Sequence, residues 1–277
     1  MMRPELAERL IDEAKALGFD SVRIAGGEPF LYPDILFGLL EYAKKAGFEY
    51  RIVKTNGFWG EWTEEELNGT AERLKECATH VSISFDSFHA AFVSPDSVWR
   101  AAGILQQHRI DSSLHIADVF GRQGAGEFLA SLGEKAVNQN YTIRPLEPIG
   151  NMEKLPPELF IRLYTPDEVF CETDGFIAVD PDGTVFPCAS PAARETGLCP
   201  GNVMNASLSE ILSEKGGAKM MEELEDPKLF REFIRFAKEQ GVDLPEKAVG
   251  GCELCSLVFR NPETAGKAGK YLEKGST

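Results

Sequence analysis

Four cysteines in the C-terminal part of the chain have a spacing that suits a metal centre. Cys171 and Cys188 are followed, after a long gap, by the CxxC pair Cys252 and Cys255. Thiolates from such a pair and from two further positions can converge on one metal, and both zinc and a [4Fe-4S] cluster accept four cysteine ligands. Cys199 lies on a loop bounded by glycine and proline and is a candidate to substitute for one of these ligands. These residues alone leave zinc and iron–sulfur open.

Polar groups at the ends of predicted strands form a second chemical feature. Gly26-Gly27-Glu28-Pro29 follows one strand, and its two glycines let the backbone approach a ligand closely. Asn56 ends the next strand, and Ser84 and Asp86 end the one after. Each of these groups alone is explained equally well by a turn or a helix cap. Together they predict one polar rim, where α/β sheets and barrels bind their ligands.

The elements that position this rim alternate between helix and strand from the start to about residue 150. Apolar spacing predicts helices near residues 4–17, 34–46, 63–78, 99–108 and 127–132. Strands are predicted near residues 21–25, 50–54, 80–86, 113–117 and 142–146. This alternation is typical of an α/β fold with a parallel sheet or barrel.

The remainder of the chain has a different pattern. Asp180-Pro181-Asp182-Gly183 lies between two short apolar runs and predicts a hairpin. Ser207 and Glu210 have the spacing of a capping box, and an apolar stripe over residues 229–237 predicts a helix that ends at Gly241. We therefore predict two domains, residues 1–150 and a small cysteine-rich α+β module at residues 151–277.

GGEP at a strand end, followed by polar residues at later strand ends, resembles the radical S-adenosylmethionine (SAM) superfamily. The resemblance implies a partial (β/α)6 TIM-like barrel that lacks its first strand, with SAM as cofactor. By the same resemblance, Gly26, Gly27, Glu28 and Pro29 meet the amino end of SAM, and Asn56, Ser84 and Asp86 contact its ribose or carboxylate. Arg144 lies on the strand that passes near the adenine in this family, although a rim salt bridge explains it as well.

The cysteine spacing is similar to the SPASM pattern that follows many radical SAM cores. Eleven residues separate Cys171 from Gly183, four more precede Cys188, and the CxxC pair follows. The later cysteines of a complete SPASM motif have no counterpart after Cys255, which resembles the shortened, one-cluster twitch domain. The resemblance favours one auxiliary [4Fe-4S] cluster held by Cys171, Cys188, Cys252 and Cys255 over a zinc site.

The defining CxxxCxxC motif of the superfamily is absent from this sequence, in which no cysteine precedes Cys77. Two explanations compete. Either the protein begins upstream with a strand and the cysteine motif, or the chain has lost the SAM cluster. We favour the first, because an open barrel edge exposes unpaired backbone groups.

Composition narrows the class of partner. The net charge of −15 argues against nucleic acid or an anionic membrane, since both select for clustered Lys and Arg. A small molecule or a peptide is expected as substrate, with a reductant protein as the electron source. No apolar stretch approaches the roughly 18 residues that span a bilayer, so we expect a cytoplasmic protein.

Two classes of function follow from the resemblance. In the first, the protein is an oxidoreductase or a peptide- or small-molecule-modifying enzyme in which a reduced cluster cleaves SAM to a radical that abstracts a substrate hydrogen. The chain as written lacks the cysteines for that cleavage. In the second, it is a non-catalytic metal-binding protein with a degenerate SAM cleft.

Overall fold

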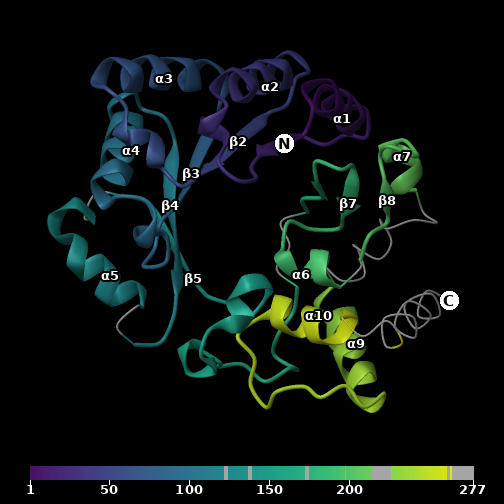
Figure 1. Cartoon of the computed structure of the whole chain (residues 1–277). Helices are drawn as coiled ribbons and strands as arrows, with labels where there is room; N and C mark the ends of the chain where they lie inside the picture. The colour runs from purple at the N-terminus through teal and green to yellow at the C-terminus, as the bar shows by residue number, and fades with distance from the viewer. Residues whose placement is uncertain are drawn as a thin grey trace. The chain divides into compact units, whose positions relative to one another are not determined.

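The structure is a computed structural model that describes residues 1–121, 124–136, 139–171, 175–196, 198–213, 226–260 and 263. It divides into two compact units, which are treated one at a time below (Figure 1). The first is Arg3–Arg144, and the second is Pro145–Thr277 together with Met1–Met2. This division lies a few residues before the predicted boundary between residues 150 and 151, which stays a prediction.

The first unit is built on a five-stranded sheet with the strand order β1-β2-β3-β4-β5. The strands are β1 (Ser21–Ile24), β2 (Tyr50–Thr55), β3 (His80–Ser84), β4 (Ser112–Asp118) and β5 (Tyr141–Pro145). The pairs β1-β2, β2-β3 and β3-β4 are parallel. The helices are α1 (Pro4–Ala16), α2 (Pro33–Lys45), α3 (Glu64–Cys77), α4 (Pro95–Gln107) and α5 (Ala125–Leu132). The predicted fold class, an α/β partial barrel, is confirmed.

Helix starts follow the sequence signals closely. Thr63 and Glu66 form the predicted capping box at the start of α3, with both reciprocal hydrogen bonds present. The helix predicted from about Trp99 begins earlier, at Pro95. Proline suits a first helical turn because its φ is already helical and its missing N–H is not needed there.

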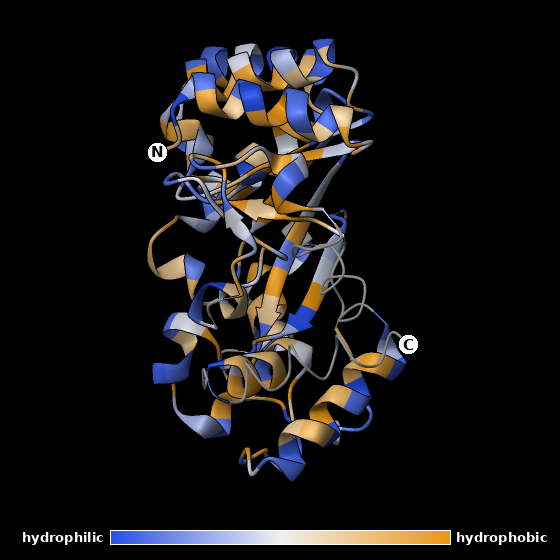
Figure 2. Cartoon of the chain, turned by 90° about the vertical axis from the view of Figure 1, so that its right-hand side faces the viewer, coloured by the Kyte–Doolittle hydropathy of each residue, from blue (hydrophilic) through white to orange (hydrophobic). Residues whose placement is uncertain are grey.

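The core of the first unit lies between the helices and one face of the sheet. Figure 2 shows that these helices carry both hydrophobic and hydrophilic residues, as expected for amphipathic helices that cover a sheet. The buried strand residues include Val53, Val81, Ile83 and Leu114, and the helix residues include Phe37, Leu40, Leu74 and Leu105. Cys77 packs as a small hydrophobic residue in this core and is 1% exposed. Among the described residues, no helix has the length and apolar character that crossing a membrane requires.

The second unit contains a small antiparallel sheet in the order β6-β7-β8. Its strands are β6 (Ala178–Val179), β7 (Thr184–Phe186) and β8 (Gly201–Asn202), and its helices are α6 (Pro191–Glu195), α7 (Leu208–Ile211), α9 (Pro227–Glu239) and α10 (Gly251–Phe259). The predicted hairpin is confirmed, and its turn needs glycine because Gly183 has a φ of +86°. The capping box of Ser207 and Glu210 is also present.

Short 3-10 helices occupy several connections. They are η1 (Pro29–Leu31), η2 (Phe58–Glu61), η3 (His89–Ala91), η4 (Gly133–Ala136), η5 (Gly150–Lys154) and η6 (Pro157–Leu159). In the second unit, α9 and α10 pack through an apolar cluster in which the rings of Phe233 and Phe259 stack with centroids 4.8 Å apart. This packing fixes the helix that carries the CxxC pair.

Candidate active site and auxiliary metal centre

Glu28 joins the ends of β1 and β2. Its buried carboxylate accepts hydrogen bonds at Oε1 from the Thr55 hydroxyl (2.8 Å) and the Phe30 backbone N–H (3.1 Å). Its Oε2 accepts one from the Asn56 backbone N–H (2.7 Å). Burial raises the pKa of Glu28, and the three hydrogen bonds counteract this only in part. The predicted rim residues Glu28 and Asn56 are therefore brought into direct contact.

The two glycines before Glu28 leave backbone open at the same place. Gly26 has a φ of +116°, which L side chains rarely adopt, and both Gly26 and Gly27 are exposed. A Cβ added at either position would meet no atom within 4 Å. Pro29 begins the 3-10 turn η1 directly afterwards. The segment thus offers accessible backbone, which fits the close approach that the sequence predicted for a ligand.

Asp86 plays the corresponding part between β3 and β4. Its Oδ1 accepts from the backbone N–H groups of Phe88 (2.9 Å) and His89 (3.0 Å) and contacts His89 Nδ1 (2.9 Å). Its Oδ2 accepts from the Ala117 N–H at 3.3 Å. Burial alone would raise the pKa of Asp86, but the hydrogen bonds of His89 and Ala117 outweigh it, and the pKa is lowered. Asp86 is therefore an ionised group that ties two strand ends together.

The remaining predicted rim residues lie on neighbouring strands. Ser84 is half-buried at the end of β3 and pairs in register with His115 of β4. Arg144 is exposed on β5, and its charge acts on His115. Asn56 forms an Asx turn, its Oδ1 accepting from the Phe58 N–H at 3.0 Å. The predicted SAM contacts are thus distributed over the ends of four strands of one sheet.

The second unit brings four cysteines together from three segments. Cys188 follows β7, Cys171 lies in the segment before β6, and Cys252 and Cys255 lie in the first two turns of α10. Both residues of the CxxC pair are therefore helical. Residues three apart in a helix lie on the same face, so both thiols can serve one metal.

The electrostatics of these thiols show that they lie near one another. The pKa of Cys252 is raised to about 12, mainly by burial and then by the Glu147 carboxylate, Cys171 and Cys188. A hydrogen bond with Ser190 lowers it in part. Burial, followed by the other three cysteines, raises the pKa of Cys255 well above its ordinary value. Within the described ranges, no three His, Cys, Asp or Glu side chains already have the arrangement that would hold a metal ion. The donor set nevertheless fits a thiophilic metal centre. Neighbouring thiolates repel one another and so raise one another's pKa, and a bound cation offsets this repulsion by stabilising the thiolate forms.

A set of charged residues supports the helix that carries the CxxC pair. Glu253 is 5% exposed, and its Oε1 accepts hydrogen bonds from the Arg162 guanidinium at 2.9 and 3.0 Å. Its Oε2 accepts from the Val249 N–H, while Glu147 accepts from the Glu253 N–H, each at 2.7 Å. Sequence reasoning missed these partners because Arg162 and Glu147 lie far away along the chain. Such outer contacts commonly orient metal ligands.

Cys199, the predicted substitute ligand, has a different environment. It is exposed, and its thiol donates to the Gly201 carbonyl oxygen at 3.3 Å. The carbonyl belongs to β8, beside the hairpin. Its part in metal binding stays a prediction.

Both units match known protein families. Residues 1–129 match the family model of the radical SAM superfamily, and residues 171–256 match SPASM, an iron-sulfur cluster-binding domain. The chain thus carries a radical SAM domain followed by a SPASM domain. The SPASM domain contains the four cysteines described above, with Cys171 as its first residue.

The radical SAM chain also resembles individual proteins along nearly its whole length. It is 26% identical over 285 residues to YydG of Bacillus subtilis (strain 168), named as a candidate peptide biosynthesis protein, and the match covers 99% of this chain and 88% of YydG. The solved structure of histidine-tagged anSMEcpe with bound AdoMet matches with a TM-score of 0.59 at 14% identity, over 99% of this chain and 89% of that one. Native anSMEcpe with bound AdoMet and Kp18Cys peptide matches with a TM-score of 0.56 at 15% identity, over 98% and 91%. These structures show the same fold.

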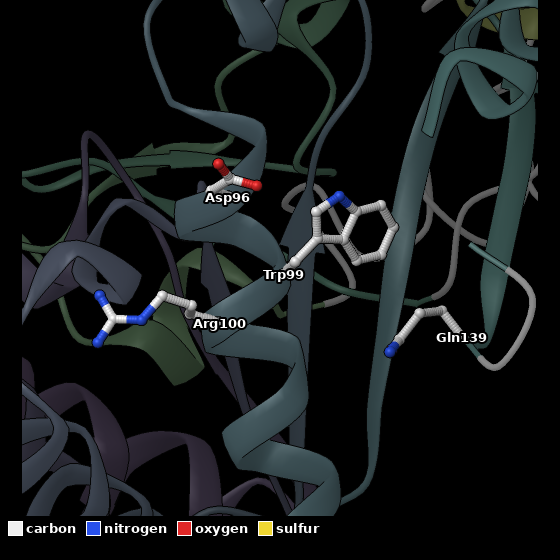
Figure 3. A pocket seen from close by; sticks show the side chains of 4 residues that line it. All are labelled: Asp96, Trp99, Arg100 and Gln139. Carbon is white, nitrogen blue, oxygen red and sulfur yellow. The ribbon is translucent and has the colours of Figure 1, made fainter. Parts of the chain in front are cut away.

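A hollow of about 540 Å³ opens beside α4 of the radical SAM unit, lined by Asp96, Trp99, Arg100 and Gln139 (Figure 3). The Arg100 guanidinium is held by the carbonyl oxygens of Gly60 and Trp62. None of the predicted SAM contacts lines this hollow. We therefore assign it no part in the chemistry.

Gly251 allows the CxxC helix of the SPASM domain to approach the segment of Cys171. A Cβ at this position would lie 2.3 Å from the Phe170 carbonyl oxygen and 3.3 Å from the Cys171 Cα. We expect Gly251→Ala to destabilise the domain by about 2 kcal/mol, because backbone rather than a flexible side chain must move. Denaturant unfolding and iron content measure the effect. The matched control is Gly69→Ala in α3, where a Cβ meets nothing within 4 Å, and equal results for both variants would contradict the close approach.

Proposed function

We propose that this protein is a radical SAM enzyme that modifies a peptide and uses a SPASM domain with one auxiliary [4Fe-4S] cluster. The observation that carries the proposal is that a radical SAM domain is followed by a SPASM domain that contains Cys171, Cys188, Cys252 and Cys255. The peptide substrate is supported by YydG, named for peptide biosynthesis, and by anSMEcpe, solved with a bound peptide.

The rim of the first unit supplies the proposed SAM contacts. The exposed Gly26–Gly27 backbone accepts from the ammonium of SAM, with Glu28 beside it and Pro29 fixing the exit of the chain. An ionised carboxylate has about four acceptor positions, and the three hydrogen bonds that Glu28 accepts leave room for one more at Oε2. Asn56, Ser84 and Asp86 contact the ribose or carboxylate, and Arg144 lies toward the adenine. Asp86 also holds the ends of β3 and β4 in place.

In this superfamily, a cluster bound by CxxxCxxC supplies the electron for SAM cleavage. No such motif occurs in these 277 residues. We propose that this chain alone does not cleave SAM, since the four SPASM cysteines fill the auxiliary site and leave no open coordination position for SAM. The same observation favours the second candidate function, a non-catalytic metal-binding protein with a degenerate SAM cleft.

Reductive SAM cleavage by two forms of the protein decides between these functions. We expect the 277-residue chain, reconstituted anaerobically with iron, sulfide and dithionite, to release no 5′-deoxyadenosine. A form with an in-frame upstream segment carrying CxxxCxxC should release it and change the mass of a peptide substrate. An extended form that stays inactive would support the non-catalytic reading. Reductant-dependent release by the short chain, abolished in Cys252→Ala, would show that the SPASM cysteines cleave SAM and would contradict the proposal.

A further inference from the structure

Glu147 supplies a cap that the CxxC helix does not provide for itself. The N-cap residue of α10 is Gly250, which has no side chain to accept from the N–H groups of the first helical turn. Glu147 Oε2 accepts from the Glu253 N–H at 2.7 Å, although the two residues are 106 positions apart along the chain. The helix that carries Cys252 and Cys255 therefore begins on a carboxylate from a distant segment.

The position of this carboxylate is fixed from two sides. A Cβ added at Gly250 would lie 3.0 Å from Oε1 and 3.1 Å from Cδ and Oε2 of Glu147, so the carboxylate lies close against the glycine. On its own segment, Glu147 precedes Pro148, which restricts the backbone of Glu147 to extended conformations. The Glu147 carbonyl oxygen also accepts from the Ile149 N–H at 2.9 Å. Glu147 is thus held in a defined orientation at the start of α10.

The charge of Glu147 acts on both cysteines of the CxxC pair. Burial is the largest cause that raises the pKa of Cys252, and the Glu147 carboxylate is the second. The neighbouring thiols Cys171 and Cys188 follow it. Glu147 also raises the pKa of Cys255, after burial and the other three cysteines. An anion that acts on two of the expected ligands disfavours further negative charge at the same place.

Two arginines near the cysteines are paired with other carboxylates. Arg162 donates to Glu253 Oε1 at 2.9 and 3.0 Å. Arg194, whose charge acts on a SPASM cysteine, donates to Asp180 at 2.6 and 3.0 Å. Each of these ion pairs adds little net charge, because the two members are of opposite sign. Glu147→Gln therefore removes one charge beside the cysteines and leaves both ion pairs in place.

We propose that Glu147 is a positioning residue that lowers the reduction potential of the auxiliary iron–sulfur centre. The inference rests on the proposed function, because it concerns the cluster that the four SPASM cysteines would hold. Reduction adds an electron to a set of thiolates that is already anionic, and a fixed carboxylate beside two of them makes that addition less favourable. A low potential suits a centre that passes its electron on.

Glu147→Gln in the full chain tests the inference, because glutamine keeps an acceptor for the Glu253 N–H and removes the charge. Anaerobic titration with dithionite, followed by electron paramagnetic resonance, measures the midpoint potential. We expect the one-electron reduction equilibrium to shift about ten-fold toward the reduced centre, which corresponds to a potential about 59 mV higher. A unit charge about 10 Å away at an effective dielectric constant of about 20 has an effect of this size. Iron and sulfide should stay at the wild-type content.

Two further variants serve as controls. Glu147→Asp keeps the charge and should stay closer to the wild-type potential than Glu147→Gln does. Glu239→Gln removes the same charge from the exposed end of α9 and should leave the potential unchanged.

The outcomes separate this inference from the proposed function. A full cluster with the wild-type potential in Glu147→Gln, or equal shifts in Glu147→Gln and Glu239→Gln, would overturn the inference and leave the iron–sulfur centre intact. Absence of the cluster from Glu147→Gln would also overturn it, because the charge would then be needed to hold the centre. Zinc without sulfide in the wild-type chain would contradict the proposed function, and the inference with it.

Discussion

Cys188→Ala is expected to abolish the auxiliary iron–sulfur centre. The anaerobically prepared wild-type chain should contain about four iron and four sulfide per molecule, as one cubane does, and the variant close to none. The small unit should also lose cooperative unfolding, because a structural metal supplies much of the folding free energy of a small module. Metal and acid-labile sulfide analysis, with hydrogen exchange over residues 145–260, measures both effects.

Cys199→Ala is the matched control for that result. Cys199 lies in the same unit but is exposed, with its thiol on the Gly201 carbonyl, so its removal should leave iron and sulfide unchanged. A full cluster in Cys188→Ala together with an empty site in Cys199→Ala would show that Cys199 is the fourth ligand. One zinc and no sulfide in the wild-type chain would replace the iron–sulfur proposal by a zinc site.

Glu28→Ala is expected to destabilise the first unit by about 3 kcal/mol and to weaken SAM binding more than ten-fold. The substitution leaves the Thr55 hydroxyl and the N–H groups of Phe30 and Asn56 without their acceptor, and each buried unpaired donor costs about 1–3 kcal/mol. The ends of β1 and β2 also lose their common tie, so the exposed glycines before Glu28 lose their fixed geometry. Urea unfolding and isothermal titration with SAM measure the two effects.

Glu28→Gln separates charge from hydrogen bonding at the same position. The pKa of Glu28 in the folded protein is raised above its ordinary value of 4.5. The contribution of Glu28 to stability is therefore greatest at a pH below 4.5 and falls as the pH rises through the folded pKa. The stability of wild type relative to Glu28→Gln should therefore decrease with rising pH. The control is Glu64→Gln, which makes the same substitution at the exposed start of α3. A stability difference that rises with pH would mean that hydrogen bonding outweighs burial at Glu28.

The sequence determined the local elements and the chemical class of both sites. Alternating apolar patterns predicted the strands of the α/β sheet, and Thr63 with Glu66 and Ser207 with Glu210 predicted two helix starts that the structure contains. These signals are local, because caps, turns and amphipathic spacing depend on residues within one or two turns of chain. The cysteine spacing pointed to a SPASM-like domain for a similar reason, since it is a fixed pattern along the chain.

Only the tertiary structure decided how the site residues are held. Glu28 contacts Thr55 and Asn56, and Glu253 contacts Arg162, across separations that no local pattern encodes. The CxxC pair lies in the first two turns of α10 because that helix buries Leu254, Val258 and Phe259 against α9, which outweighs the turn preference of the glycines at its start. Strand register likewise decides which side chains share a face, since it puts Arg23, Ile52 and His80 on the side of the sheet opposite the buried Val53 and Val81. Burial and pairing between distant segments are properties of the packed chain, and the sequence specifies them only through the fold as a whole.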